Sequence, residues 1–251
     1  MKPNYEIIDG RCVIPYGVKM IIYKEFESSY DLREVVIPAS VTIICADAFS
    51  DCLSLGEVAL PDSITSIGNG AFSDCPLKSV KFPKRLLRIG SGAFAGCELE
   101  SVELPENVLR IEEGAFSGCA WLKDISVDEK NPAFRSVSNT CLTKDGKTVV
   151  FGCKNSFIPS GARHIGTRAF EGCWDLESIT IPEGVVSIGD RAFSGCRNLR
   201  WIKLPKSLKT IGREAFRYCE KLIQPEIHAG VEMGEDAFFF PKDWDNNELP
   251  F

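Results

Sequence analysis

The chain has 251 residues, of which 44% are hydrophobic and 25% are charged, and its formal net charge is −6. This balance is typical of a globular protein and excludes an intrinsically disordered chain. The acidic charge argues against nucleic acid and against an anionic membrane surface as partners. No apolar run approaches the ~20 residues of a transmembrane helix, so we expect no membrane span.

The first residues, MKPNYEIIDGRCVIPYG, contain no uninterrupted apolar stretch of the ~7–15 residues that a secretory signal needs. We therefore expect a soluble chain that is cytoplasmic as written, or one from which a signal has been removed. Residues 1–14 precede the regular pattern described next, and we expect them to cap the N-terminal end of the fold.

An internal repeat of 22 or 23 residues runs through most of the chain. Ala-Phe pairs mark it, with successive spacings of 23, 22, 22, 54, 23, 23 and 22 residues, and prolines recur at the same interval. The first unit has Glu25–Phe26 in place of Ala-Phe, and the last has His228 near its proline position. Such a period is the signature of a repeat architecture. The pairs begin at Ala48, Ala71, Ala93, Ala115, Ala169, Ala192, Ala215 and Ala237.

One clear unit is LGEVALPDSITSIGNGAFSDC, residues 55–75. Val58 and Leu60 alternate with less apolar neighbours, which predicts a short strand with one buried face. Pro61 ends this strand because it has no N–H to donate to a ladder. Ile67 continues the inward face, and Ala71–Phe72 begin a tight helical or turn segment.

Stacked units bury their apolar sides against one another, so the repeat predicts a single solenoid domain over residues 1–251. Each coil would add a strand to a parallel sheet at about 4.8 Å spacing, and about ten coils give a rod or shallow arc about 45 Å long. The repeat phenylalanines should form one buried row of Phe72, Phe94, Phe116, Phe170, Phe193 and Phe216.

The pattern L-x-x-V-x-L-P-x-x-I-x-x-I-G-x-x-A-F-x-x-C resembles the BspA-like class of leucine-rich repeats over roughly residues 10–240. It lacks the Asn/Cys position that follows the strand in commoner leucine-rich repeats. The resemblance implies a β-rich α/β solenoid, a right-handed leucine-rich-repeat-like coil with short parallel strands. It also implies a bacterial or protozoan protein, often at the cell surface or secreted, with adhesion or host binding as its role.

A 54-residue gap between Ala115 and Ala169 interrupts the period, and we assign the extra length to an insertion at residues 128–158. Within it, CLTKDGKTVVF predicts a β-hairpin around Asp145–Gly146 with a type I′ turn. NPAF before it predicts a turn into a further strand. An insertion in a solenoid maps to one face and is a candidate binding edge. The alternative is an enlarged repeat whose hairpin covers the core.

Eleven cysteines raise the question of disulfides, a metal site or catalysis. Seven follow the repeat phenylalanine by three residues, so we expect buried, reduced core thiols. No C-x-x-C or Cys/His pair has the spacing of a zinc site. The seven are Cys52, Cys75, Cys97, Cys119, Cys173, Cys196 and Cys219.

The chain carries no motif that indicates catalysis. His164 and His228 lie nearly three repeats apart and cannot share a site, and the carboxylates are scattered over solvent-facing positions. No nucleophile–base constellation and no nucleotide-binding glycine loop is present. We therefore expect no catalytic, cofactor-binding or metal-binding residues.

The outward positions of the expected strands form the candidate binding surface. Phe157 and Trp201 occupy slots that hold Glu, Ser, Asp or Ala in most other units. Large exposed aromatic side chains are typical anchors for partners; the alternative is that each ring packs on a neighbouring side chain or covers a coil end. The candidate binding residues are Phe157, Trp201, Lys203, Ser178 and Thr180.

These observations favour a non-enzymatic scaffold that binds a protein, peptide or glycan through its sheet face. One alternative is a structural spacer that presents another module. A less favoured one is an enzyme with an unrecognised site at the insertion. We expect the aromatic and acidic C-terminus, residues 239–251, to cap the last coil, because an open solenoid end exposes core and an unpaired strand edge.

Overall fold

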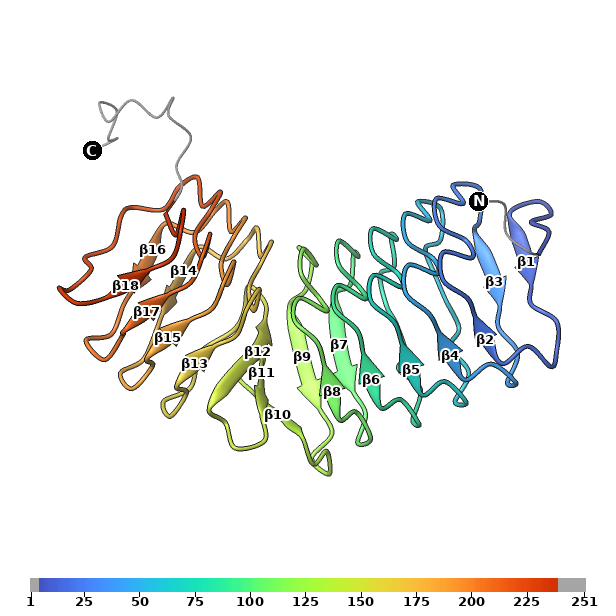
Figure 1. Ribbon diagram of the computed structural model, residues 1–251, viewed down its shortest axis with the longest axis horizontal. Coiled ribbons are helices and arrows are strands. Elements are labelled where there is room, and N and C mark those ends of the chain that lie inside the picture. Colours follow the sequence, from blue (N-terminus) through green and yellow to red (C-terminus); the bar gives the residue numbers. More distant parts are fainter. Residues whose placement is uncertain (1–4, 239–251) are drawn as a thin grey trace.

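The computed structural model describes residues 5–238, which form one arc of stacked coils (Figure 1). The fold is a parallel-strand solenoid of about ten coils, which confirms the architecture predicted from the repeat. Residues 239–251, the predicted C-terminal cap, and residues 1–4 of the predicted N-terminal cap lie outside the described residues. Tyr5 and Ile7 of that N-terminal segment pack on the core of the first coil.

Each coil has two walls, which we name after their inward residues. The valine wall carries the predicted V-x-L strands, which pair in parallel as β1–β3, β7–β9 and β14–β16. Its strands are β1 Arg11–Val13, β3 Glu34–Val36, β7 Ser101–Leu104, β9 Asp124–Val127, β14 Ser178–Thr180 and β16 Trp201–Lys203.

The isoleucine wall carries short strands, most of which end at the repeat isoleucine, together with the three strands of the insertion. They form a five-stranded sheet of order β2-β4-β5-β6-β8 and a seven-stranded sheet of order β10-β11-β12-β13-β15-β17-β18. The strands are β2 Met20–Ile21, β4 Ile43–Ile44, β5 Ser66–Ile67, β6 Arg88–Ile89, β8 Arg110–Ile111, β10 Phe134–Val137, β11 Thr140–Thr143, β12 Thr148–Gly152, β13 His164–Ile165, β15 Ser187–Ile188, β17 Thr210–Ile211 and β18 Glu232–Met233.

The most continuous sheet is therefore not where the sequence pattern placed it. Residues 56–60, the strand expected around Val58, alternate in burial but form no strand. In the same coil, β5 pairs with coils on both sides. The glycine after the isoleucine explains the difference. A Cβ on Gly68 would lie 2.5 Å from the backbone nitrogen of Ala46, so the coils come this close only because the residue has no side chain.

The segment that begins at each Ala-Phe pair is a turn, and the described residues contain no helix. The Phe49 N–H donates to the Ala71 carbonyl of the next coil, and the equivalent bond recurs along the solenoid at 2.7–2.8 Å. Two residues of most turns have left-handed backbone: the one before Ala-Phe, such as Gly70, and the one before the cysteine, such as Asp74. We call this row of turns the turn edge.

The six phenylalanines of the predicted row are all buried, but the repeat phenylalanines form two stacks rather than the single row we expected. The first runs from Phe26 to Phe116, with centroid separations of 5.0–5.7 Å, and Phe151 of the insertion extends it. The second runs from Phe170 to Phe238.

Gly152 separates the two stacks. Its N–H donates to the Ala169 carbonyl at 2.8 Å, the bond that a repeat phenylalanine makes in other coils. No ring stands in this slot, and the Phe170 ring lies against the glycine instead. A Cβ on Gly152 would meet the Phe170 ring at 2.1 Å. The core is accordingly divided into two clusters that meet at the insertion.

The repeat cysteines fill buried positions, and all eleven cysteines of the chain are free. In six coils the thiol donates to the carbonyl of the preceding coil's phenylalanine at 3.0–3.1 Å, as Cys75 does to Phe49. Cys173 is directed instead at the Gly152 carbonyl, at 3.7 Å. The cysteine is thus a small core side chain that also binds a carbonyl of its neighbour.

The insertion contains the predicted hairpin, β11–β12, and the predicted further strand, β10, all antiparallel. The expected type I′ turn is wrong, because it needs two left-handed residues and only Gly146 is left-handed here. The Asp145 carboxylate accepts from the Thr143 hydroxyl and the Lys147 N–H, which stabilises a longer loop. β12 pairs in parallel with β13, so the hairpin takes the place of one coil in the isoleucine wall.

Asn131 and Pro132 end the five-stranded sheet at β8. The Asn131 side chain is fully buried and donates to the Pro105 and Val108 carbonyls at 2.9 and 3.0 Å. Its Oδ1 accepts from the Ala133 and Phe134 N–H groups. These N–H groups are therefore not available to pair with β8, and Pro132 has none to offer. The NPAF segment interrupts the sheet for this reason.

Gly152→Ala should destabilise the protein by roughly 1–3 kcal/mol, because the new methyl group overlaps the Phe170 ring in a packed core. Urea denaturation measures the change. Gly56→Ala is the matched control, since its nearest neighbour would lie at 4.0 Å and its backbone is not left-handed. Equal stability of the two variants would contradict the packing assigned to Gly152.

Asn131→Ala should lower the free energy of unfolding by at least about 3 kcal/mol, because it leaves two carbonyls and two N–H groups without their partner in the interior. Asn107→Ala removes a similar amide-to-carbonyl bond, to Lys84, at an exposed position and should cost less than about 1 kcal/mol. Thermal and urea unfolding of both variants test this, and a small loss at Asn131 would contradict its role as the junction.

The buried thiols should make stability fall at alkaline pH. Burial raises the pKa of Cys97, Cys119, Cys173 and Cys196 above the ordinary thiol value. A group whose folded pKa is raised contributes its full stability below its unfolded pKa, about 8.5 for a thiol, and loses it as the pH rises further. Each such thiol should cost about 1.4 kcal/mol per pH unit in that range.

Thermal unfolding between pH 7 and pH 10 measures this effect. The Cys119→Ser, Cys196→Ser double variant should show a shallower decline, because serine does not ionise there. An identical pH profile for the variant and the parent protein would show that other groups cause the decline.

Candidate binding face

Four of the five predicted binding residues form one patch on the valine wall. β14 and β16 pair in parallel with Ser178 opposite Trp201 and Thr180 opposite Lys203. All four side chains are exposed, whereas Ile179, which lies between Ser178 and Thr180 on β14, is buried. The alternation arises because successive strand residues point to opposite sides of the wall.

Phe157 lies one repeat before Thr180, and its side chain is 73% exposed. The hairpin fixes its backbone: the Phe157 N–H donates to the Ser138 carbonyl, and its own carbonyl accepts from the Thr140 hydroxyl. The Phe157 ring makes no ring contact within the described residues, and neither does the Trp201 ring, which is 61% exposed. Both rings therefore point outward, as predicted from the repeat register; their role in binding stays a prediction.

The two rings flank a polar floor. Phe157 and Trp201 lie two coils apart, which is about 10 Å along the solenoid axis. Along the strand direction, they stand at neighbouring outward positions. Ser178 and Thr180 lie between them with short hydroxyl side chains, and Lys203 lies beside Thr180. We call these five residues the aromatic patch. A partner could place an apolar group on each ring and a polar group on the floor between them.

The sequence reasoning did not single out a groove on the same wall, next to the aromatic patch. It has a volume of about 800 Å³ and crosses three successive coils, which include β7 and β9. Three lysines and three acidic residues line it together with serines: Lys81, Lys84, Lys130, Glu103, Asp128, Glu129, Ser79, Ser101 and Ser126.

One signal in the sequence could have located the groove. Most valine-wall segments end with Leu, Ile or Phe followed by proline, but the coil of β9 has Val127–Asp128 there. The chain leaves its regular path at this point and continues toward Asn131 and the hairpin. The groove lies where the regular coil and the insertion diverge.

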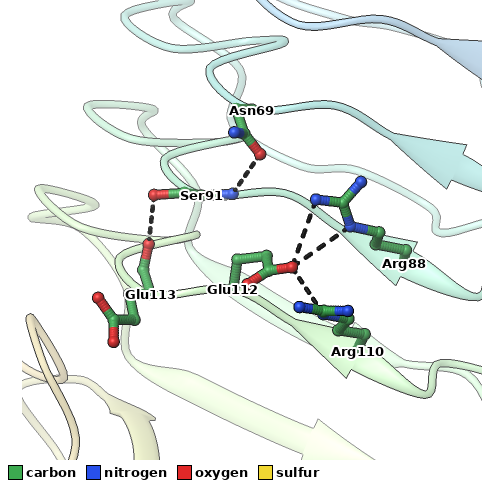
Figure 2. Close-up of polar contacts among 6 residues, drawn as sticks. All are labelled: Asn69, Arg88, Ser91, Arg110, Glu112 and Glu113. Atoms are coloured by element: carbon green, nitrogen blue, oxygen red, sulfur yellow. Dashed lines mark hydrogen bonds and ion pairs between the residues drawn. The ribbon is translucent and has the colours of Figure 1, made fainter.

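The isoleucine wall near the insertion carries charged side chains that form ion pairs with one another (Figure 2). Arg88 and Arg110 stand side by side in the β6–β8 register, where two like charges repel. The Glu112 carboxylate accepts from both, with its Oε1 at 3.3 Å from Arg88 and 2.7 Å from Arg110. Beside them, the Ser91 N–H donates to the Asn69 side chain and the Ser91 hydroxyl to the Glu113 carbonyl. These contacts hold coils together, so we do not assign binding to them.

The histidines occupy separate places. His164 is exposed on β13 and shares a 2.8 Å hydrogen bond with the Ser187 hydroxyl, whereas His228 lies in the last coil. Among residues 5–238, no group of His, Cys, Asp and Glu side chains is arranged to hold a metal ion. The same residues include no helix that is long and apolar enough to cross a bilayer.

The stacked coils, the two walls and the exposed strand face define a leucine-rich repeat solenoid. The chain belongs to the BspA-type leucine-rich repeat family, whose model matches residues 19–142 and 149–250 in six copies. This confirms the resemblance that the repeat pattern carries. No curated protein matches the chain significantly.

Two solved structures of similar fold also resemble the chain in sequence. A leucine-rich cell surface protein from Faecalibacterium prausnitzii is 31% identical over 88% of this chain, with a TM-score of 0.80. The pneumococcal vaccine antigen PcpA is 28% identical over 91% of this chain, also with a TM-score of 0.80. The chain spans 60% and 59% of the lengths of these proteins.

A leucine-rich repeat protein from Bacteroides ovatus is 26% identical over 90% of this chain and 59% of its own, with a TM-score of 0.58. Leucine-rich repeat proteins are generally non-enzymatic scaffolds. The family and the fold together support a repeat scaffold for this chain.

Proposed function

We propose that the chain is a non-enzymatic recognition scaffold with an adhesion-type role, and that its partner binds the valine wall across the groove and the aromatic patch. The observation that carries this proposal is the exposure of Phe157 and Trp201 in slots that most coils fill with small or polar side chains. Exposing a large ring to water gains nothing for folding. Such rings are typical anchors of interfaces.

The groove favours a polypeptide among the protein, peptide and glycan partners. It presents lysines such as Lys81 beside acidic residues such as Glu103, and a neutral glycan would cover these charges without supplying counter-charges. A polypeptide carries both signs of charge, together with apolar side chains for the two rings. The partner would then place a mixed-charge segment in the groove and an apolar segment on the aromatic patch.

The relatives support a surface setting. The Faecalibacterium prausnitzii protein is described as a cell surface protein. We extend this setting to the present chain as part of the proposal, so that the partner is met outside the cell. An adhesion-type scaffold needs this exposure.

The two alternative functions have less support. A spacer that only presents another module would not need two exposed rings on one wall. An enzyme site at the insertion would need free polar groups there, but Asn131, Thr143 and Asp145 are engaged in holding the loops of the insertion. Recognition is therefore the function that the exposed groups favour.

Replacing Phe157 and Trp201 together by serine should weaken partner binding at least about tenfold, because central aromatic anchors contribute most of the affinity of an interface. The free energy of unfolding should change by less than about 1 kcal/mol, because both rings are exposed. A biosensor screen of host extracellular proteins, peptides and glycans identifies the partner, and urea denaturation measures stability.

Trp121→Ser is the matched control, because Trp121 is 58% exposed but precedes β9 rather than standing in an outward strand slot. It should leave both binding and stability unchanged. A loss of several kcal/mol in the double variant would instead make the rings structural. Unchanged binding by the double variant would place the site elsewhere on the solenoid.

A further inference from the structure

In the last three regular coils, the left-handed positions of the turn edge hold residues that are unusual for this backbone conformation. Glycine or aspartate holds most of the left-handed positions elsewhere, because glycine adopts this conformation freely and aspartate tolerates it. Arg168, Arg191 and Glu214 hold the position before Ala-Phe, and Tyr218 holds the position before the cysteine, with φ between 53° and 59°. This backbone is unfavourable for long side chains, and such departures concentrate at functional sites.

Three of these side chains meet at one cavity. It has a volume of about 370 Å³ and lies on the turn edge, away from the valine wall. Arg191, Glu214 and Tyr218 line it together with Glu171, Ser194 and Arg217. Arg168 lies beside it and pairs with Glu171 at 3.6 Å. Lys24 of the first coil also has left-handed backbone, but the cavity is built by the consecutive coils of Glu171, Arg191 and Glu214.

Glu214 orients the two arginines of the cavity. Its side chain is only 11% exposed, and its two oxygens accept from Arg191 Nε at 2.5 Å and from Arg217 Nη1 at 2.6 Å. The hydrogen bond from Arg191 lowers the pKa of Glu214, which keeps the carboxylate ionised. The Arg217 guanidinium also lies over the Tyr218 ring, 4.7 Å from its centroid. The cationic groups are thus held in place before any ligand arrives.

The arrangement leaves donors directed at the cavity. Within the described residues, Arg191 uses only Nε in side-chain hydrogen bonds, so its two terminal NH₂ groups have no protein acceptor. The Ser194 hydroxyl likewise makes no hydrogen bond with the described residues, although Ser194 is buried. Arg191 and Arg217 pair with Glu214, and Arg168 pairs with Glu171. A fixed guanidinium fork with spare donors matches the two oxygens of a carboxylate or phosphate.

We propose that this cavity binds an oxyanion, with the terminal Arg191 nitrogens and the Ser194 hydroxyl as its donors. The cavity is large enough for a ligand of monosaccharide size, so the oxyanion is the carboxylate of a sugar acid or a free phosphate ion. This site is separate from the valine wall and does not depend on the proposed partner there.

Isothermal titration with glucuronate, inorganic phosphate and glucose tests the proposal and distinguishes the two sources. Glucuronate or phosphate should bind saturably and more weakly as sodium chloride rises, whereas glucose, which has no charge, should not bind. Saturation by glucuronate identifies the sugar acid, and saturation by phosphate alone identifies the free ion. Failure of both anions to bind, or equal binding of glucose, overturns the proposal.

Arg191→Gln should weaken anion binding at least about tenfold, since it removes a charge-assisted pair of donors. Arg213→Gln is the matched control: Arg213 follows the repeat glycine of the coil of β17, does not line the cavity, and should leave affinity unchanged. Arg191→Lys keeps the charge but loses the fork, so it should also bind more weakly even if the glutamine variant folds poorly. Unchanged affinity in both Arg191 variants overturns the assignment.

Tyr218→Gly separates binding from structure. Glycine suits the left-handed backbone and stands at this position in the two preceding coils, as Gly172 and Gly195. The variant should keep or raise the melting temperature and bind the anion more weakly, because it loses one wall of the cavity. A lower melting temperature with unchanged anion affinity would show that the tyrosine serves the fold, and would overturn its place in the site.

Discussion

The contact between successive Ala-Phe turns is the interaction on which the rest of the solenoid depends. At this one place, the phenylalanine N–H bonds the alanine carbonyl of the next coil, the rings stack at about 5 Å, and the cysteine thiol donates to the phenylalanine carbonyl of the coil before it. With the close backbone approach at glycines such as Gly68, these contacts set the spacing of the coils. The outward slots of the valine wall take no part in them, so they can change without cost to the core.

The insertion is the place where this contact is replaced. Gly152 keeps the backbone bond to Ala169 but supplies no ring, and Phe151 fills the space on the other side.

The two halves also differ in charge. Residues 1–131 carry 13 basic and 20 acidic side chains, a net −7, whereas residues 132–238 carry 15 and 12, a net +3. The aromatic patch and the turn-edge cavity both lie in the positive half, and its field favours the approach of an anionic ligand or an acidic partner surface.

The repeat pattern predicted the solenoid, the buried phenylalanines and cysteines, and the outward direction of Phe157 and Trp201, and the turn residues of the insertion predicted its hairpin. The sequence reasoning failed where one residue's role depends on a neighbour in another coil. The sequence around Gly152 does not show that the Phe170 ring occupies the space where a side chain would lie. Asn131 is likewise indistinguishable from a loop residue in the sequence, because the four backbone groups that its side chain binds are known only from the structure. The groove and the turn-edge cavity are missed for the same reason, because each is built by side chains from several coils.

A repeat protein offers its own control for deciding which residues serve function. Every coil meets the same folding demands, so a residue that differs from its counterparts without a packing reason needs another explanation. For Phe157 the counterparts are small or charged, and the difference is visible in the sequence. For Tyr218 the counterparts include Gly172 and Gly195, and the difference becomes meaningful only once the backbone is known to be left-handed there. The first kind of departure can be read from aligned repeats, whereas the second requires the dihedral angles. This is why the turn-edge site emerges from the structure and not from the repeat pattern.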